Sequence, residues 1–214
     1  MNFMIVNKIS NEFPKEILIA TNNEGKFVEI EALLKSINIK AVPAFKFNIS
    51  EPEETGLTFQ ENSLLKAKYY AKATNLLALA DDSGLCVEAL NNQPGIYSAR
   101  WALNQNGARD FDFAFTKIYQ ELQKKAVDFS QDLRAHFICN LTIFDPKSAF
   151  NISFEGRIDG KLKFPAVGNK GFGYDPIFIK DGMNKTFGEI AADEKDKISH
   201  RGVAFAKFLD WLKN

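Results

Sequence analysis

The chain has 214 residues, of which 45% are hydrophobic and 20 are phenylalanine. A chain of this length and composition can bury a substantial core, which excludes an intrinsically disordered protein. Lys plus Arg and Asp plus Glu both total 27, so no net charge favours binding to nucleic acid or to an anionic membrane.

Residues 1–14 are expected to be a short extension before the first strand. Their start, "MNFMIV", has neither the basic residues nor the cleavage site of a signal peptide, and no later apolar run reaches membrane-spanning length. The two cysteines, Cys86 and Cys139, lie in apolar runs and are expected to be buried free thiols. We therefore expect a soluble cytoplasmic protein with no membrane partner.

The first structured segment is a strand that leads into a helix. Ile17–Ala20 is an apolar run that predicts a buried strand, and the apolar spacing of residues 27–37 predicts a helix. The junction between them, Thr21–Lys26, contains two amides, a glycine and a lysine. At such a junction the free helical amides and the helix dipole favour an anion, and Gly25 permits close approach of the backbone. The spacing is not that of a Walker motif, and Asn23 could be a simple helix cap.

The middle of the chain alternates strands, loops and helices. A short strand is predicted at 41–45, followed by the loop "NISEPEETGLT" and a helix at 59–74 on which Asn62 and Lys66 share a face. The segment "NLLALADDSGLCVEAL" predicts a buried strand, a break at 81–84 and a second strand. A Gly/Pro loop at 91–97 and a helix at 111–125 complete this part.

The last third is rich in strands. Residues 134–145 and 149–162 are predicted to form a hairpin around Pro146, and "GNKGFGYDPIFI" is a Gly-rich loop that enters a last strand. Residues 199–213 predict a closing helix. Because no repeat, low-complexity segment or linker divides the chain, we expect a single domain over 1–214 with a mixed α/β fold.

Carboxylates gather at two places. Glu51, Glu53 and Glu54 lie in the "EPEETG" loop, and Asp81 and Asp82 end a buried strand. Adjacent buried aspartates require cationic compensation, and Mg²⁺ accepts such carboxylates while it shares its coordination with substrate phosphates. One aspartate can hold the ion while its neighbour takes a proton from water. The alternative is that 81–84 is only a turn between strands.

Two later motifs could recognise a nucleobase. In "GFGYDP", Phe172 or Tyr174 could stack on a base and Asp175 could accept hydrogen bonds, although the aromatics could equally fill the core. In "DKISHRG", His200 and Arg201 offer donors that suit a keto oxygen, although the same residues could simply start a helix.

Six motifs in this order and spacing resemble the inosine triphosphate pyrophosphatase family: "TNNEGK", "EETGLTFQENSLLKA", "ADDSGL", "PGIYSARWA", "GFGYDPIF" and "ISHRG". The resemblance extends from Ile17 to Leu212. It departs from the family at Asn22, where many members have glycine, and in the extension before Ile17, which has no assignable counterpart.

The resemblance implies an elongated α/β fold with a central, long-stranded mixed sheet flanked by helices, and usually a homodimer. It also implies Mg²⁺-dependent hydrolysis of ITP, dITP and XTP to the monophosphate and pyrophosphate, which keeps these deaminated purines out of nucleic acid.

By resemblance, the triphosphate is held by Thr21, Asn22, Asn23, Glu24, Gly25, Lys26 and Lys66. Glu53 and Asp82 resemble the metal-binding acids, with Asp82 also the proton acceptor and Asp81 supporting the ion. Ser83 touches substrate. The base pocket and its rim are implied to comprise Phe172, Gly173, Tyr174, Asp175, Lys195, His200 and Arg201.

Two other functions compete with this interpretation. A related pyrophosphatase for modified pyrimidine triphosphates would need the same phosphate chemistry with a different base pocket. A nucleotide- or nucleic-acid-binding module without turnover is disfavoured by the acid cluster and the balanced charge. Covalent catalysis through Ser83, Cys86 or Cys139 is the least favoured mechanism, since no spacing places a histidine beside Cys86.

Overall fold

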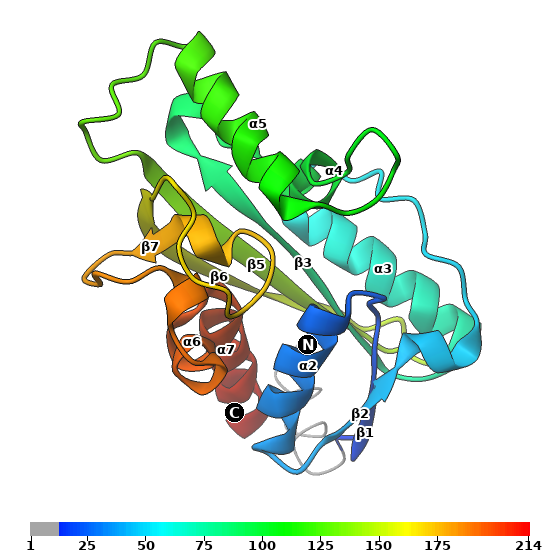
Figure 1. Cartoon of the computed structure of the whole chain (residues 1–214). Coiled ribbons are helices and arrows are strands. Elements are labelled where there is room, and N and C mark those ends of the chain that lie inside the picture. The colour runs from blue at the N-terminus through cyan, green and yellow to red at the C-terminus, as the bar shows by residue number, and fades with distance from the viewer. Residues whose placement is uncertain (1–12) are drawn as a thin grey trace. The chain divides into compact units, whose positions relative to one another are not determined.

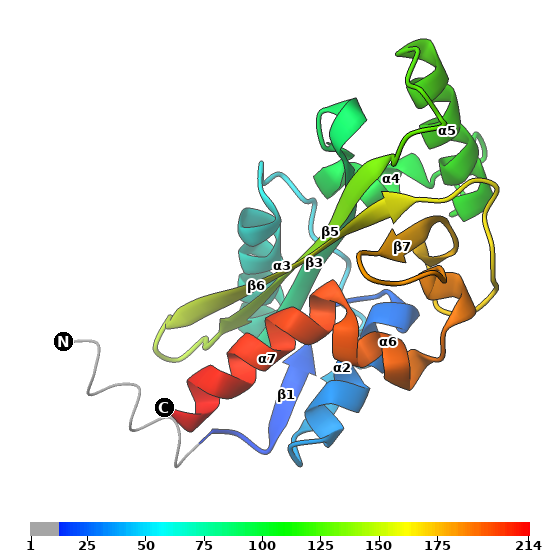
Figure 2. The same ribbon diagram turned by 90° about the vertical axis from the view of Figure 1, so that its left-hand side faces the viewer.

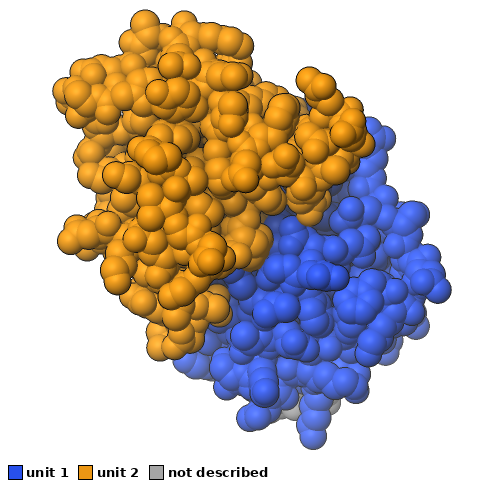
Figure 3. All heavy atoms as spheres, in the orientation of Figure 1, with its two compact units in different colours: residues 1–82, 139–156, 201–214 blue, residues 83–138, 157–200 orange. Residues whose placement is uncertain are grey.

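The computed structural model describes residues 13–214, so most of the predicted extension at 1–14 lies outside the described residues. The described chain forms two compact units (Figure 3). Unit 1 comprises the residues up to Asp82, together with Cys139–Gly156 and Arg201–Asn214, and unit 2 comprises Ser83–Ile138 and Arg157–His200. The single domain expected over 1–214 stays a prediction. No helix among residues 13–214 combines the length and the apolar character needed to span a membrane.

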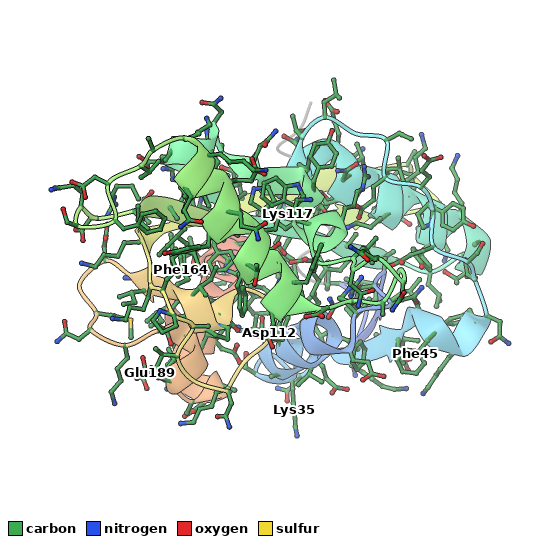
Figure 4. All side chains as sticks on the ribbon, turned by 45° about the horizontal axis from the view of Figure 1, so that its top comes forward. Lys35, Phe45, Asp112, Lys117, Phe164 and Glu189 are labelled. Atoms are coloured by element: carbon green, nitrogen blue, oxygen red, sulfur yellow. The ribbon has the colours of Figure 1, made fainter. Side chains whose placement is uncertain are left out.

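Unit 1 begins with a β-α-β crossover (Figure 1). Strand β1 (Glu16–Ile19) leads into helix α2 (Glu24–Lys35) and then into β2 (Lys40–Pro43), which pairs with β1 in parallel. A 3-10 helix, η1 (Ala44–Phe47), follows, and its Phe45 is 55% exposed (Figure 4). The predicted strand at 41–45 therefore exists but ends at Pro43.

The two faces of the unit 1 sheet are covered by different helices because side chains alternate along each strand. One face carries Ile17 and Ile19, which pack with apolar residues of α2 and of α7 (His200–Lys213). The other face carries Leu18 and Ala20, which pack with α3 (Phe59–Thr74). Figure 2 shows α2 and α7 beside β1. Burial on both faces explains the unbroken apolar run of β1.

The strand β3 (Ala78–Val87) is continuous, so the predicted break at 81–84 is wrong. Its first part pairs with β1 in parallel, with Leu18 opposite Ala78. Its second part pairs with β4 (Gln93–Pro94), with Cys86 opposite Pro94. Asp81 and Asp82 can lie in a buried strand because cationic side chains from other elements compensate their charges. The sequence pattern "DDSG" is typical of a turn and does not reveal those partners.

The long strands β5 (Arg134–Phe144) and β6 (Asn151–Leu162) are neighbours in the sheet, and each contributes to both units. The connection between them is closed by the N–H of Asp145, which donates to the carbonyl of Phe150 over 2.9 Å. The hairpin predicted around Pro146 is confirmed.

Unit 2 adds β7 (Phe178–Lys180), which is antiparallel to β6, and three helices: α4 (Ser98–Trp101), α5 (Phe111–Lys124) and α6 (Ala192–Ile198). Lys117 lies on α5 (Figure 4), and its ammonium lies 4.5 Å from the ring centre of Trp101. Five short 3-10 helices complete the described chain: η1, η2 (Glu88–Leu90), η3 (Gly95–Tyr97), η4 (Asp175–Ile177) and η5 (Phe187–Glu189). The helix at 111–125 is confirmed. Helix α6 was not predicted, because "ADEKDKI" has no apolar period.

Candidate active site

The predicted phosphate loop of unit 1 is the N-terminus of α2. Asn23 is the N-cap of the helix, and its side-chain Oδ1 accepts from the N–H of Lys26 over 3.1 Å. Thr21 is buried and accepts from the N–H of Asn23, also over 3.1 Å. The side chain of Asn22 donates to the Tyr70 hydroxyl over 3.3 Å. Asn23 is therefore a helix cap, as the alternative interpretation of the sequence predicted, and its side chain occupies the N–H of Lys26.

Asp81 lies fully buried among donors from three other elements. Its Oδ1 pairs with the ammonium of Lys26 on α2. Its Oδ2 accepts from Nε of Arg201 on α7 over 3.0 Å and from the thiol of Cys139 on β5 over 3.0 Å. Arg201 in turn pairs with Glu29 on α2. This network fastens both helices to the end of the first part of β3.

Asp82, the next residue, has a different environment. Its Oδ1 accepts from Nζ of Lys66 over 2.7 Å, and the same ammonium lies 2.6 Å from Oε1 of Glu54. Its Oδ2 is buried and has no hydrogen-bond partner among the described residues. Asp82 therefore has one anchored carboxylate oxygen and one that accepts no hydrogen bond from residues 13–214.

The two aspartates have opposite shifts of pKa. Burial by itself would raise the pKa of Asp81, but the charges of Arg201 and Lys26 hold it well below its ordinary value. Burial raises the pKa of Asp82 above its ordinary value, against the opposing charge of Lys66. Burial likewise opposes the charged form of Lys66, yet the carboxylates of Asp82 and Glu54 raise its pKa. Adjacent carboxyls whose environments drive their pKa values apart are typical of a catalytic base beside a permanently charged partner.

The donor set of unit 1 suits a magnesium ion that is shared with substrate. Among residues 13–214, no three His, Cys, Asp or Glu side chains are grouped as a ready-made metal site. Mg²⁺ needs no such cage, because it usually takes one or two protein carboxylates and completes its shell with phosphates and water. Carboxylates that could serve this purpose are Asp82, whose Oδ2 has no hydrogen-bond partner among the described residues, and those of the acid loop, which we define as residues 51–56. Glu53 in this loop is exposed, and its neighbour Glu54 is bound to Lys66.

Unit 2 carries a second group of predicted site residues. The carboxylate of Asp175 accepts from the N–H of Phe172 over 2.8 Å and pairs with the buried ammonium of Lys195. That ammonium lies 4.7 Å from the ring centre of Phe172. Gly171 has φ +69°, and a Cβ there would lie 2.1 Å from Oδ2 of Asp175. The loop thus requires glycine at this position to wrap around its own carboxylate.

The aromatics of this loop divide between two roles. Tyr174 is buried, donates to the carbonyl of Ser98 over 2.9 Å and packs edge-on against Phe111. Phe172 and Gly173 remain half-buried. Tyr174 therefore packs in the core, as the alternative interpretation predicted. Phe172 is the aromatic side chain of this loop that could stack on a base.

Two further predicted residues lie in unit 2. His200 is buried, and its ring stacks on Phe137 with centroids 4.6 Å apart and planes 10° apart. Ser83 is half-buried in β3, directly after Asp82. The structure thus gathers the predicted residues into two groups, one in each unit: Lys26, Lys66, Asp81, Asp82 and Arg201 in unit 1, and Phe172, Asp175 and Lys195 in unit 2.

Two acids of the unit 1 group were not singled out from the sequence. The resemblance assigns a role to Glu53 and none to Glu54, and nothing in the linear pattern distinguishes the two. Glu29 lies in the middle of α2, and its pairing with Arg201 spans 172 positions of the chain. Its one signal was an acid on the buried side of an amphipathic helix.

Comparison with known proteins assigns the chain to a family. The model of the Ham1 family matches residues 17–211. The chain belongs to the Ham1 family. A dITP/XTP pyrophosphatase from Zymomonas mobilis is 45% identical over 196 residues, which are 92% of this chain and 91% of that protein. Another from Agrobacterium fabrum is 42% identical over 204 residues, which are 92% and 95% of the two chains.

Solved structures of Ham1 proteins have the same fold. A HAM1 protein from Coxiella burnetii superposes with a TM-score of 0.80 at 36% identity, over 92% of this chain and 98% of that one. The Ham1 protein of Staphylococcus aureus gives 0.77 at 35% identity, over the same shares. The resemblance stated from the six motifs and the predicted mixed α/β class are confirmed.

Proposed function

We propose that this Ham1 protein hydrolyses dITP, ITP and XTP to the monophosphate and pyrophosphate in a reaction that depends on Mg²⁺. The enzyme class, a nucleoside triphosphate pyrophosphatase, follows from the family and from relatives named dITP/XTP pyrophosphatases. The observation that carries the mechanism is the contrast between Asp81, saturated by donors, and Asp82, which has a partnerless oxygen and a raised pKa.

In this mechanism Asp82 is the general base. It accepts a proton from the water that attacks the α-phosphorus, the bond between that phosphorus and the bridging oxygen breaks, and pyrophosphate leaves with the electron pair. Lys66 holds Oδ1 of Asp82 and therefore fixes the direction of the other oxygen. Its charge, with that of Lys26, would offset the triphosphate.

Metal binding is assigned to Asp82 and the acid loop, with Glu53 as the exposed ligand. Mg²⁺ held there would neutralise charge on the phosphates and orient them for in-line attack. Asp81 already accepts from Lys26, Arg201 and Cys139. We therefore propose that Asp81 supports the site by holding Lys26 in place, rather than by direct ligation.

Base recognition is assigned to the unit 2 group and to the pair His200 and Arg201. Phe172 would stack on the purine, and donors from His200 and Arg201 would meet the six-keto oxygen that hypoxanthine and xanthine share. Adenine presents an amino group there, which would leave those donors unpaired, and such mismatches support large discrimination.

The test is steady-state release of pyrophosphate from ITP, dITP, XTP, ATP, GTP and a modified pyrimidine triphosphate, each with Mg²⁺ and with EDTA. We expect release from the first three only, and only with Mg²⁺. GTP shares the six-keto oxygen, so its rejection would depend on its two-amino group. Faster release from the pyrimidine triphosphate would refute the proposed base pocket. Equal rates of release with Mg²⁺ and with EDTA would refute the metal-dependent mechanism. The homodimer implied by resemblance is a separate proposal, which sedimentation velocity would decide.

A further inference from the structure

A buried asparagine connects the acid loop to the helix that carries Lys66. Asn62 lies in the first turns of α3 and is 0% exposed. Its Oδ1 accepts from the N–H of Gly56 over 2.8 Å. Gly56 ends the acid loop, two residues after Glu54. Asn62 therefore binds the backbone of the loop rather than one of its side chains.

The contact needs glycine at position 56. A Cβ on Gly56 would lie 2.6 Å from Oδ1 of Asn62 and 2.7 Å from Cβ of Glu61, closer than packed atoms allow. The following N–H, of Leu57, donates to Oε2 of Glu61 over 2.7 Å. The end of the acid loop is thus held against α3 by two consecutive backbone donors.

A second attachment lies one helical turn further along α3. Lys66 follows Asn62 by four residues and so shares its face of the helix. Nζ of Lys66 binds Glu54 over 2.6 Å and Asp82 over 2.7 Å. The loop is therefore fixed at Gly56 through its backbone and at Glu54 through its carboxylate, and the second attachment also reaches the proposed base.

The amide of Asn62 is only half satisfied. Its Nδ2 is buried and has no hydrogen-bond partner among the described residues. An unpaired buried donor destabilises the folded protein. An apolar side chain that only filled space in α3 would avoid that cost, whereas Asn62 in addition satisfies the backbone N–H of Gly56.

We propose that Asn62 is a positioning residue: it holds the acid loop in register with Lys66, so that Glu53 and Glu54 meet the metal–triphosphate at the right place. This inference rests on the proposed function for its catalytic consequence. The structural half, that Asn62 protects the Gly56 amide, stands independently of any activity.

The test compares Asn62→Ala with Ser63→Ala in the full chain. Ser63 is equally buried and adjacent, but its hydroxyl bonds to Asn140 and Thr142 on β5, over 2.8 and 2.6 Å, and not to the acid loop. Both variants remove a buried hydrogen bond, so both should lower the unfolding temperature. Only Asn62→Ala should release the loop.

Two measurements separate the variants. Hydrogen exchange of the Gly56 amide, followed by NMR without nucleotide or metal, should be about tenfold faster in Asn62→Ala and unchanged in Ser63→Ala, as expected for loss of one hydrogen bond. The Mg²⁺ concentration that gives half-maximal pyrophosphate release should rise about tenfold in Asn62→Ala. Its kcat at saturating Mg²⁺ should stay within about threefold of wild type, since the base is untouched.

Unchanged Gly56 exchange in Asn62→Ala, or an equal shift in Mg²⁺ dependence in Ser63→Ala, overturns the inference. If Asn62→Ala does not fold, Gly56→Ala breaks the same contact from the other side by steric overlap and must show the same Mg²⁺ shift. A wild-type protein that releases no pyrophosphate refutes the proposed function, while the exchange measurement still decides whether Asn62 holds the loop.

Discussion

Lys66 Nζ lies 2.7 Å from Oδ1 of Asp82, which links the helix α3 to the end of the first part of β3. The same ammonium binds Glu54. Both groups are largely buried, and their mutual charges favour the ionised forms. This one cation therefore sets the orientation of the proposed base and of an acid in the loop, so the predictions begin with Asp82.

Asp82→Asn should abolish most turnover and keep the fold. The amide has the size of the carboxylate and can still accept from Lys66, whose charge remains paired with Glu54. Loss of a general base typically lowers kcat by ~10²–10⁴-fold. Pyrophosphate release measures kcat, and the unfolding temperature checks the fold. Turnover near the wild-type rate would remove Asp82 from the mechanism.

The pH dependence of kcat/KM should report the same carboxyl. Because burial raises the pKa of Asp82 above its ordinary value of 3.8, activity should fall as the pH drops through a value above 3.8, where the base becomes protonated. The residual activity of Asp82→Asn should lack this limb. If the activity of the variant still falls at acidic pH, the titrating group is not Asp82.

Asp81→Asn should weaken the fold, chiefly above the ordinary aspartate pKa. A carboxyl with a lowered folded pKa stabilises the native state above its unfolded value of 3.8, and that stability is lost as the pH falls through the folded pKa. Removing one partner of a buried pair costs ~3–5 kcal/mol. Urea unfolding at neutral pH and at pH values below 3.8 should show a large difference that shrinks with acid.

The matched control for Asp81 is Asp159→Asn. Asp159 pairs with Arg157 over 2.7 Å at the surface, where both side chains are nearly half exposed. Such pairs contribute about 0–1 kcal/mol. Equal losses from the two substitutions would contradict the buried network.

His200→Phe should reduce the preference for dITP over dATP. Phenylalanine can keep the stacking on Phe137, but it has no ring N–H to donate to a keto oxygen. We expect the ratio of kcat/KM values to fall by about 10-fold or more, the usual worth of a lost specific hydrogen bond. Arg201→Ala is a poorer test, because it would also remove the ion pairs that Arg201 makes with Asp81 and Glu29. An unchanged ratio would place base recognition elsewhere.

Neither cysteine should react with a thiol reagent in the native protein. Both Cys86 and Cys139 are buried and free, as the sequence indicated. Burial raises the pKa of Cys86 to about 11 and that of Cys139 well above its ordinary value, so little thiolate forms. Titration with an aromatic disulfide should find no reactive thiol before unfolding in urea and two afterwards. Rapid labelling of the native protein would contradict this burial.

The spacing of apolar residues predicted most helices and strands, because that spacing is a property of each segment by itself. The helix at 59–74 is found with those bounds, and the strand at 17–20 is shifted by one residue. The prediction failed at 81–84, where Asp-Asp-Ser-Gly was read as a break. The strand continues there because Lys26 and Arg201 compensate Asp81 and Lys66 compensates Asp82. Those cations come from distant parts of the chain.

The amino-acid sequence by itself determined the family, the α/β class and the residue types of the site, because six ordered motifs and local apolar periods carry that information. Only the tertiary structure decided how two adjacent aspartates differ. Asp81 accepts from Lys26, Arg201 and Cys139, whereas Asp82 accepts from Lys66. The charge state of a carboxylate depends on its burial and on its partners in space, and neighbours along the chain encode neither.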